Sequence, residues 1–194
     1  MIKAILLIFE PVMTWDKIAL AQKSLRQVLI LFLTPLILIS VGGELAGLLY
    51  FGKLRELEQA VKIPVEKAVI YGAVQLLFSF AVVLIGAKAI KSVSETFHSR
   101  HTFAQCFTVV AYALSPLFLV RLLDAFPAMN PWASFGIGIV LAVTTLYHGV
   151  PRVLQPDPPH AFGLYLISAL MLAGVAGLAR FLTLLLLAGK IKGF

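Results

Sequence analysis

Five long apolar blocks divide this chain of 194 residues and leave little sequence for a water-soluble domain. The clearest block lies between Lys67 and Lys88, where 20 consecutive residues carry no charge. As an α-helix, a stretch of this length spans about 30 Å, which is the thickness of the hydrocarbon core of a bilayer. Hydrophobic residues make up 60% of the chain and are gathered in the blocks. The pattern therefore predicts an all-α, polytopic membrane protein.

We expect one domain of five transmembrane helices over residues 27–194, preceded by an N-terminal interfacial segment over residues 1–26. The uncharged stretches predict spans at residues 27–50, 65–90, 103–123, 131–150 and 161–189. The prolines and short lengths of the last two connections leave no room for a further domain. The fold class is thus a single helical bundle with short interfacial amphipathic helices.

Two interfacial helices are expected outside the spans. After Pro11, Thr14 is a candidate N-cap for a helix whose apolar face carries Trp15 and Ile18. Between the first two spans, the helical spacing of apolar residues over 54–61 predicts a second short helix that ends at Ile63. Both would lie at the membrane surface.

The net charge of +7 does not indicate a nucleic-acid partner, because no basic cluster with interleaved aromatic residues is present. The basic residues flank the apolar blocks, as expected for contacts with anionic lipid headgroups. Flanking Lys and Arg divide eight against seven between the two sides, so orientation depends on the first segment, which favours a cytoplasmic N-terminus. Cys106, the single cysteine, cannot form an intrachain disulfide. We expect an integral protein of a bacterial cytoplasmic (inner) membrane, with the lipid bilayer as its partner.

Two charged residues fall inside the predicted spans. Glu44 follows 17 uncharged residues of the first span, and Arg180 interrupts an otherwise uncharged stretch at residues 158–189. Because the first and fifth spans run in the same direction, the two side chains are expected at similar depth. They are candidates for an intramembrane charge pair, since ionisable groups within a span are costly unless they are paired. The alternative is that both extend to the headgroups.

Proline and small residues predict bends and close helix packing. Pro35 and Pro116 lie inside the first and third spans, where each removes a backbone donor. Hydroxyl groups near Pro116, such as that of Tyr112, are candidates to satisfy the freed carbonyls. Gly43 and Gly47 have the spacing that lets two helices approach closely.

Chemical motifs are few. Glu95, His98 and His101 are spaced three apart and form a weak candidate set of metal ligands, without a visible fourth ligand. Solvated polar residues at an interface give the same composition. The sequence has no Gly-x-Ser-x-Gly, no His-Glu-x-x-His and no phosphate-binding glycine loop. We therefore expect neither enzymatic activity nor a cofactor.

The order of features resembles the Yip-domain family, five-span membrane proteins named for interaction with Ypt/Rab GTPases. The resemblance covers nearly the whole chain and is carried by three segments: Phe9-Glu-Pro-Val-Met-Thr-Trp15-Asp-Lys-Ile18, Ala111-Tyr112-Ala-Leu-Ser-Pro116 and Leu146-Tyr147-His-Gly149-Val-Pro-Arg152-Val. Tyr112, Pro116 and Gly149 are the positions carried over from the family, with a structural role.

The resemblance implies a trafficking or membrane-organising protein with a cytoplasmic N-terminus. The Asp-Leu-Tyr-Gly-Pro motif and the long polar N-terminal tail of the eukaryotic branch are missing, which counts against a Rab-type GTPase as partner. The short N-terminus is similar to that of bacterial members. We expect a non-enzymatic scaffold that binds another membrane protein or a second copy of itself. The alternative is a small transporter or lipid-handling protein with a polar cavity near Glu44 and Arg180.

Overall fold

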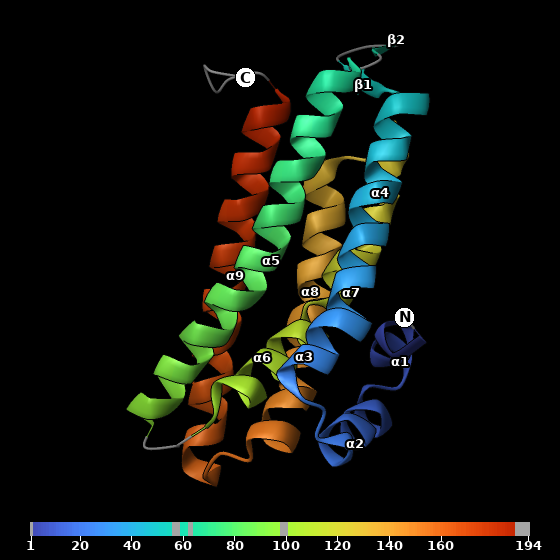
Figure 1. Cartoon of the computed structure of the whole chain (residues 1–194). Coiled ribbons are helices and arrows are strands. Elements are labelled where there is room, and N and C mark those ends of the chain that lie inside the picture. The colour runs from blue at the N-terminus through green and yellow to red at the C-terminus, as the bar shows by residue number, and fades with distance from the viewer. Residues whose placement is uncertain (1, 56–58, 62–63, 98–100, 189–194) are drawn as a thin grey trace.

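Long helices lie side by side and run most of the height of the molecule (Figure 1). The computed structural model describes residues 2–55, 59–61, 64–97 and 101–188. Within these residues, five helical segments are long and apolar enough to cross a membrane: Leu25–Tyr50, Val65–Thr96, Phe103–Ala125, Pro131–Leu154 and Pro158–Leu187. Each contains most of one predicted span, so the expected all-α, five-span architecture is confirmed.

The five segments are built from shorter elements where the helix is interrupted. The first comprises α3 (Leu25–Val28), the π-helical turn η1 (Leu29–Leu33) and α4 (Thr34–Tyr50). The second is the unbroken α5 (Val65–Thr96). The third comprises α6 (Phe103–Ala113), α7 (Ser115–Val120) and the 3₁₀ turn η2 (Arg121–Ala125). The fourth joins α8 (Pro131–Gly149) to the π-helical turn η3 (Val150–Leu154), and the fifth is α9 (Pro158–Leu187).

Prolines lie beside two of these interruptions, the π-helical turn η1 and the break between α6 and α7. Pro35 is the second residue of α4, one residue after η1, where the wider π-helical turn adapts the backbone to a missing donor. Pro116 follows the break between α6 and α7. A helical residue at position 116 would donate its N–H to the carbonyl of Tyr112. The Ser115 hydroxyl donates to that carbonyl instead, at 2.7 Å.

The N-terminal segment forms two helices rather than the one expected. They are α1 (Ile2–Phe9) and α2 (Pro11–Ala21). The start predicted at Thr14 is wrong: α2 begins at Pro11, because the fixed φ of proline suits the first helical position. Thr14 is instead buried inside the helix, beside Trp15 and Ile18. The two helices contact α7, α8 and η3, so they lie against the bundle.

The connection between the first two spans was predicted wrongly as a helix. It contains the strands β1 (Lys53–Arg55) and β2 (Gln59–Val61), which pair antiparallel with Leu54 opposite Ala60. Gly52 precedes the hairpin with φ of 73°, a conformation that favours glycine and ends the helical path. This hairpin lies at the opposite end of the molecule from α2 (Figure 1).

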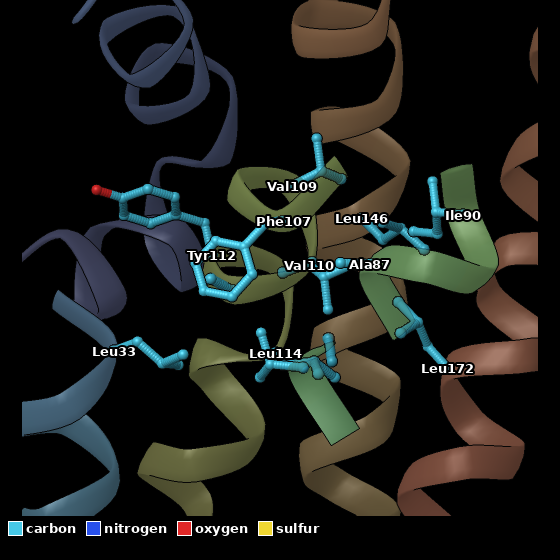
Figure 2. Close-up of a cluster of buried hydrophobic side chains, with 14 of the residues drawn as sticks. Leu33, Ala87, Ile90, Phe107, Val109, Val110, Tyr112, Leu114, Leu146 and Leu172 are labelled. Atoms are coloured by element: carbon cyan, nitrogen blue, oxygen red, sulfur yellow. The ribbon is translucent and has the colours of Figure 1, made fainter. Parts of the chain in front are cut away.

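The apolar core surrounds α6. All eight residues from Cys106 to Ala113 are buried, so α6 is covered on every side by other elements. Figure 2 shows side chains from α5, α8 and α9 converging on this helix, among them Ile90, Leu146 and Leu172. The third span is therefore the central helix, and the other spans and the N-terminal helices enclose it.

Candidate functional site

Glu44 lies in α4 with only 2% of its surface exposed. Two side chains of α5 hydrogen-bond to its carboxylate: Tyr71 Oη donates to Oε1 at 2.5 Å, and Gln75 Nε2 donates to Oε2. Tyr71, Gln75 and Ser79 are four residues apart and therefore share one face of α5. A polar stripe on a mostly apolar helix thus faces the acidic residue of its neighbour.

Two arginines also approach the Glu44 carboxylate. Arg180 Nη1 of α9 lies 3.5 Å from Glu44 Oε1, and the Arg180 side chain is 4% exposed. Arg121 Nε of η2 lies 3.3 Å from Glu44 Oε2. The structure therefore places Glu44 and Arg180, which are 136 residues apart in the chain, within ion-pair distance, and it adds Arg121 to them.

A second carboxylate completes the cluster. Asp124 Oδ2 of η2 pairs with Arg180 Nη2, and Ser134 Oγ at the start of α8 donates to Asp124 Oδ1 at 2.5 Å. We call Glu44, Arg121, Asp124 and Arg180 the ion-pair network. Its two acidic and two basic residues balance in charge, which is the condition under which charges are tolerated away from water.

The network lies about two helical turns inside the hairpin end of the bundle. Glu44 is six residues before the end of α4 at Tyr50, and Arg180 is seven residues before the end of α9 at Leu187. At 1.5 Å per residue, both lie roughly 9–10 Å from those helix ends. The network joins α4, η2 and α9, and its hydrogen-bond partners on α5 and α8 connect the remaining two spans to it.

Close backbone contact brings η2 to this position. A Cβ atom on Gly47 would lie 2.3 Å from the backbone of Ala125, and one on Gly43 would lie 2.6 Å from Leu122. The two glycines therefore let α4 approach η2 at a distance that side chains would prevent. This contact sets Arg121 and Asp124 beside Glu44.

A small cavity adjoins the network. Its volume is about 40 Å³, and its lining includes Arg121, Asp124 and Arg180 together with apolar side chains such as Val82 and Phe118. This volume has room for a few water molecules. It is well below the roughly 300–1,000 Å³ of pockets that bind small molecules.

The sequence pattern did not identify Arg121 and Asp124 as members of the site. Arg121 follows the uncharged stretch of the third span and has the position expected of a headgroup-binding residue, and Asp124 falls in the predicted connection. Their opposite charges three residues apart were the available signal. The 3₁₀ turn η2 continues the helix past both residues and turns them inward.

The residues that carry the family resemblance meet at one point. The Trp15 ring of α2 packs edge-on against Tyr112 of α6, with ring centroids 6.1 Å apart. Trp15 Nε1 donates to the Thr145 carbonyl of α8 at 2.9 Å. A Cβ atom on Gly149 would lie 2.5 Å from the Trp15 ring, so only glycine leaves room for it. These contacts attach α2 to the bundle.

The candidate metal ligands remain a prediction. Glu95 lies near the end of α5, where Lys91 Nζ approaches it at 3.7 Å, and His98 lies outside the described residues. His101 precedes α6, and burial lowers its pKa below the usual value of an imidazole. Within the described part of the chain, no three His, Cys, Asp or Glu side chains are grouped as metal ligands would be.

Comparison with known proteins gives one match. Residues 5–181 match the sequence model of the Yip1 domain. No curated protein and no solved structure matches the chain. The matched range includes the three resemblance segments and all four residues of the ion-pair network.

Proposed function

Since the chain belongs to the Yip1 domain family, we propose that it acts as a non-enzymatic scaffold that organises the membrane or binds a membrane partner. Proteins of this family associate with membranes, and some with Rab GTPases. The proposal rests mainly on the ion-pair network, whose four charges balance one another inside the bundle. Such a network holds helices together and leaves recognition to the outer surface.

The size of the adjoining cavity supports the same proposal. A transporter needs a polar path that reaches the middle of the membrane and admits its substrate. The cavity beside the network has a volume of about 40 Å³, and apolar side chains make up most of its lining apart from the charged residues. A site of this size suits bound water better than a transported solute.

The outer surface offers area for lateral association. Only 22% of the most apolar 18-residue stretch of α9 is buried inside the bundle, which is the lowest share among the five described spans. Leu170 and Leu178 are two of its exposed side chains, at 66% and 60%. A photo-cross-linking residue at either position in native membranes tests the proposal. Leu77, exposed on α5, serves as the matched position on another helix.

We expect α9 positions to give one discrete protein adduct, whose partner then purifies with the protein at a fixed ratio. Adducts to lipid alone, together with saturable solute flux in proteoliposomes of the purified protein, would overturn the scaffold proposal. That outcome would support the alternative of a small transporter or lipid-handling protein. The observation that favours this alternative is that Arg121, Asp124 and Arg180 line the cavity.

We further propose that the N-terminus faces the cytoplasm of a bacterial inner membrane. The basic residues Lys3, Lys17 and Lys23 precede the first span, and the positive charges of the first segment usually dominate orientation under the positive-inside rule. A cysteine at exposed Leu20, with native Cys106 buried, tests the orientation. It should react with a membrane-impermeant maleimide only after cells are opened. Labelling of intact spheroplasts would reverse the assignment.

A further inference from the structure

A second, larger cavity opens at the end of the molecule opposite the hairpin. Its volume is about 490 Å³, within the usual range of ligand pockets. It lies where the α2–α3 connection, the start of α6 and η3 meet, and it includes Lys23, Thr102, Gln105 and Arg152. None of these residues belongs to the ion-pair network.

The lining of this cavity is basic. Lys23 and Arg152 are its two charged side chains among the described residues, and the Asp16 carboxylate that pairs with Arg152 lies outside the lining. Arg152 Nε bonds Asp16 at 2.9 Å and Arg152 Nη1 donates to the His148 carbonyl at 3.0 Å, which fixes the guanidinium in place. Among the described residues, Lys23 has no hydrogen bond or ion pair. Within the part of the chain that the structure describes, the cavity therefore offers one oriented guanidinium and one ammonium group without an ion pair.

Further positive charge surrounds Lys23. The pKa of Lys3 is lowered, first by burial and then by the charges of Lys23 and Lys17. The ammonium groups of Lys17 and Lys23 thus each lie close enough to Lys3 to repel it. An anion at this end of the molecule would relieve that repulsion, and the strength of the effect would fall with salt.

Neutral donors complete the lining. Gln105 Oε1 accepts from the backbone N–H and the hydroxyl of Thr102, at 2.9 and 3.0 Å, so the Gln105 side chain is held and its Nε2 amide stays available as a donor. Gln22 and Gln155 also line the cavity, each with positive φ, at the ends of α2 and η3. Both residues have the left-handed backbone conformation and end their helices at the border of the cavity.

Exposed apolar side chains lie on the two N-terminal helices, the second of which borders the cavity. On α1 and α2, Phe9 is 76% exposed, Met13 57% and Leu20 84%. Helices that combine such side chains with lysines lie in the headgroup region, with the apolar groups toward the acyl chains. A ligand that reaches the cavity from this region has an anionic head and an apolar tail.

We propose that this cavity binds the phosphate group of an anionic membrane lipid, with Lys23 and Arg152 as its charged ligands and Gln105 as a neutral donor. Basic pockets at a membrane surface bind lipid headgroups in this way. The proposal is independent of any protein partner of the scaffold and would hold for a transporter as well. It also gives α1 and α2 a role beyond covering the core.

The test uses the full chain purified in neutral detergent, with phosphatidylglycerol as the probe and phosphatidylcholine as the uncharged lipid comparison. Lipid binding is measured by native mass spectrometry. We expect Lys23→Gln to weaken phosphatidylglycerol binding about fivefold, the effect of one basic residue near an anionic surface. Lys23→Arg should retain binding. Lys67→Gln, which removes an exposed lysine at the hairpin end, should leave it unchanged.

Three results would overturn the proposal. Equal binding of phosphatidylglycerol by the wild type, Lys23→Gln and Lys67→Gln would show that the cavity is not the site. Equal binding of the two lipids would show that negative charge is not recognised. Full competition by millimolar glycerol 3-phosphate would make a soluble phosphate ester the ligand. Thermal unfolding of Lys23→Gln in detergent alone should match the wild type, because Lys23 is exposed.

Discussion

Replacing Arg180 by Met tests the ion-pair network most directly. The substitution keeps the aliphatic stem of the side chain and removes the guanidinium, which contacts both Glu44 and Asp124. Glu44 retains Arg121, Tyr71 and Gln75, whereas Asp124 retains the Ser134 hydroxyl but loses its ion pair with Arg180, and the network changes from neutral to a net charge of −1. Removing one member of a buried pair typically costs about 3–5 kcal/mol, because the remaining charge is left uncompensated.

That cost needs little reduction for solvent screening, since Arg180 is 4% exposed. It is a large part of the roughly 5–15 kcal/mol that stabilises a folded protein. The free energy of unfolding is measured by titrating SDS into dodecylmaltoside micelles and following circular dichroism. Lys91→Met is the matched control, because its pair with Glu95 is exposed on both sides and is worth only about 0.3–0.5 kcal/mol.

A double variant sharpens the test. Adding Asp124→Asn to Arg180→Met restores electrical neutrality, so the double variant should be more stable than Arg180→Met alone by at least about 1 kcal/mol. The reasoning fails if Arg180→Met costs no more than Lys91→Met, or if Asp124→Asn gives no recovery. Either result would mean that Arg180 reaches the headgroups or water and does not depend on the carboxylates.

Two further predictions use the same unfolding assay, and a third uses thiol labelling. Gly47→Ala should destabilise the protein by about 1–3 kcal/mol, because the added methyl group conflicts with η2. Gly42→Ala should stabilise it slightly, because a Cβ atom there meets no atom within 4 Å. Equal effects of the two substitutions would contradict the close contact. Trp15→Phe should cost about 1–2 kcal/mol by removing the indole N–H that donates to the Thr145 carbonyl, and an unchanged midpoint would show that the bond is unimportant. Cys106, fully buried, should react with maleimide only after denaturation, and rapid labelling of the folded protein would contradict its burial.

Local sequence was sufficient for the spans. Length, hydropathy and the absence of charge are properties of contiguous residues, and they predicted each span with ends that differ from the structure by up to six residues. The largest difference is at the end of α5, predicted at residue 90 and observed at Thr96. Polar residues after Ile90 ended the apolar block but not the helix, because a helix continues beyond the hydrocarbon core without cost.

The connections were harder to predict, because short segments have weak patterns. Apolar residues at helical spacing over 54–61 also fit a short hairpin, and the positive φ at Gly52 decided against a helix. At the N-terminus, Thr14 had the chemistry of a cap, but Pro11 had the stronger preference for the first helical position. In both places a neighbouring residue with a restricted or unusual φ determined the outcome.

The sequence by itself determined that this chain has five segments long and apolar enough to cross a membrane, that proline interrupts its third span near residue 116, and that Glu44 and Arg180 are candidates for a charge pair. These follow from hydrophobicity and from the cost of isolated charge, which depend on residue type alone. Only the tertiary structure decided which partners they have. Arg121 and Asp124 enter the network because Gly43 and Gly47 let η2 approach α4, and such contacts depend on helix rotation and separation, which no local pattern encodes.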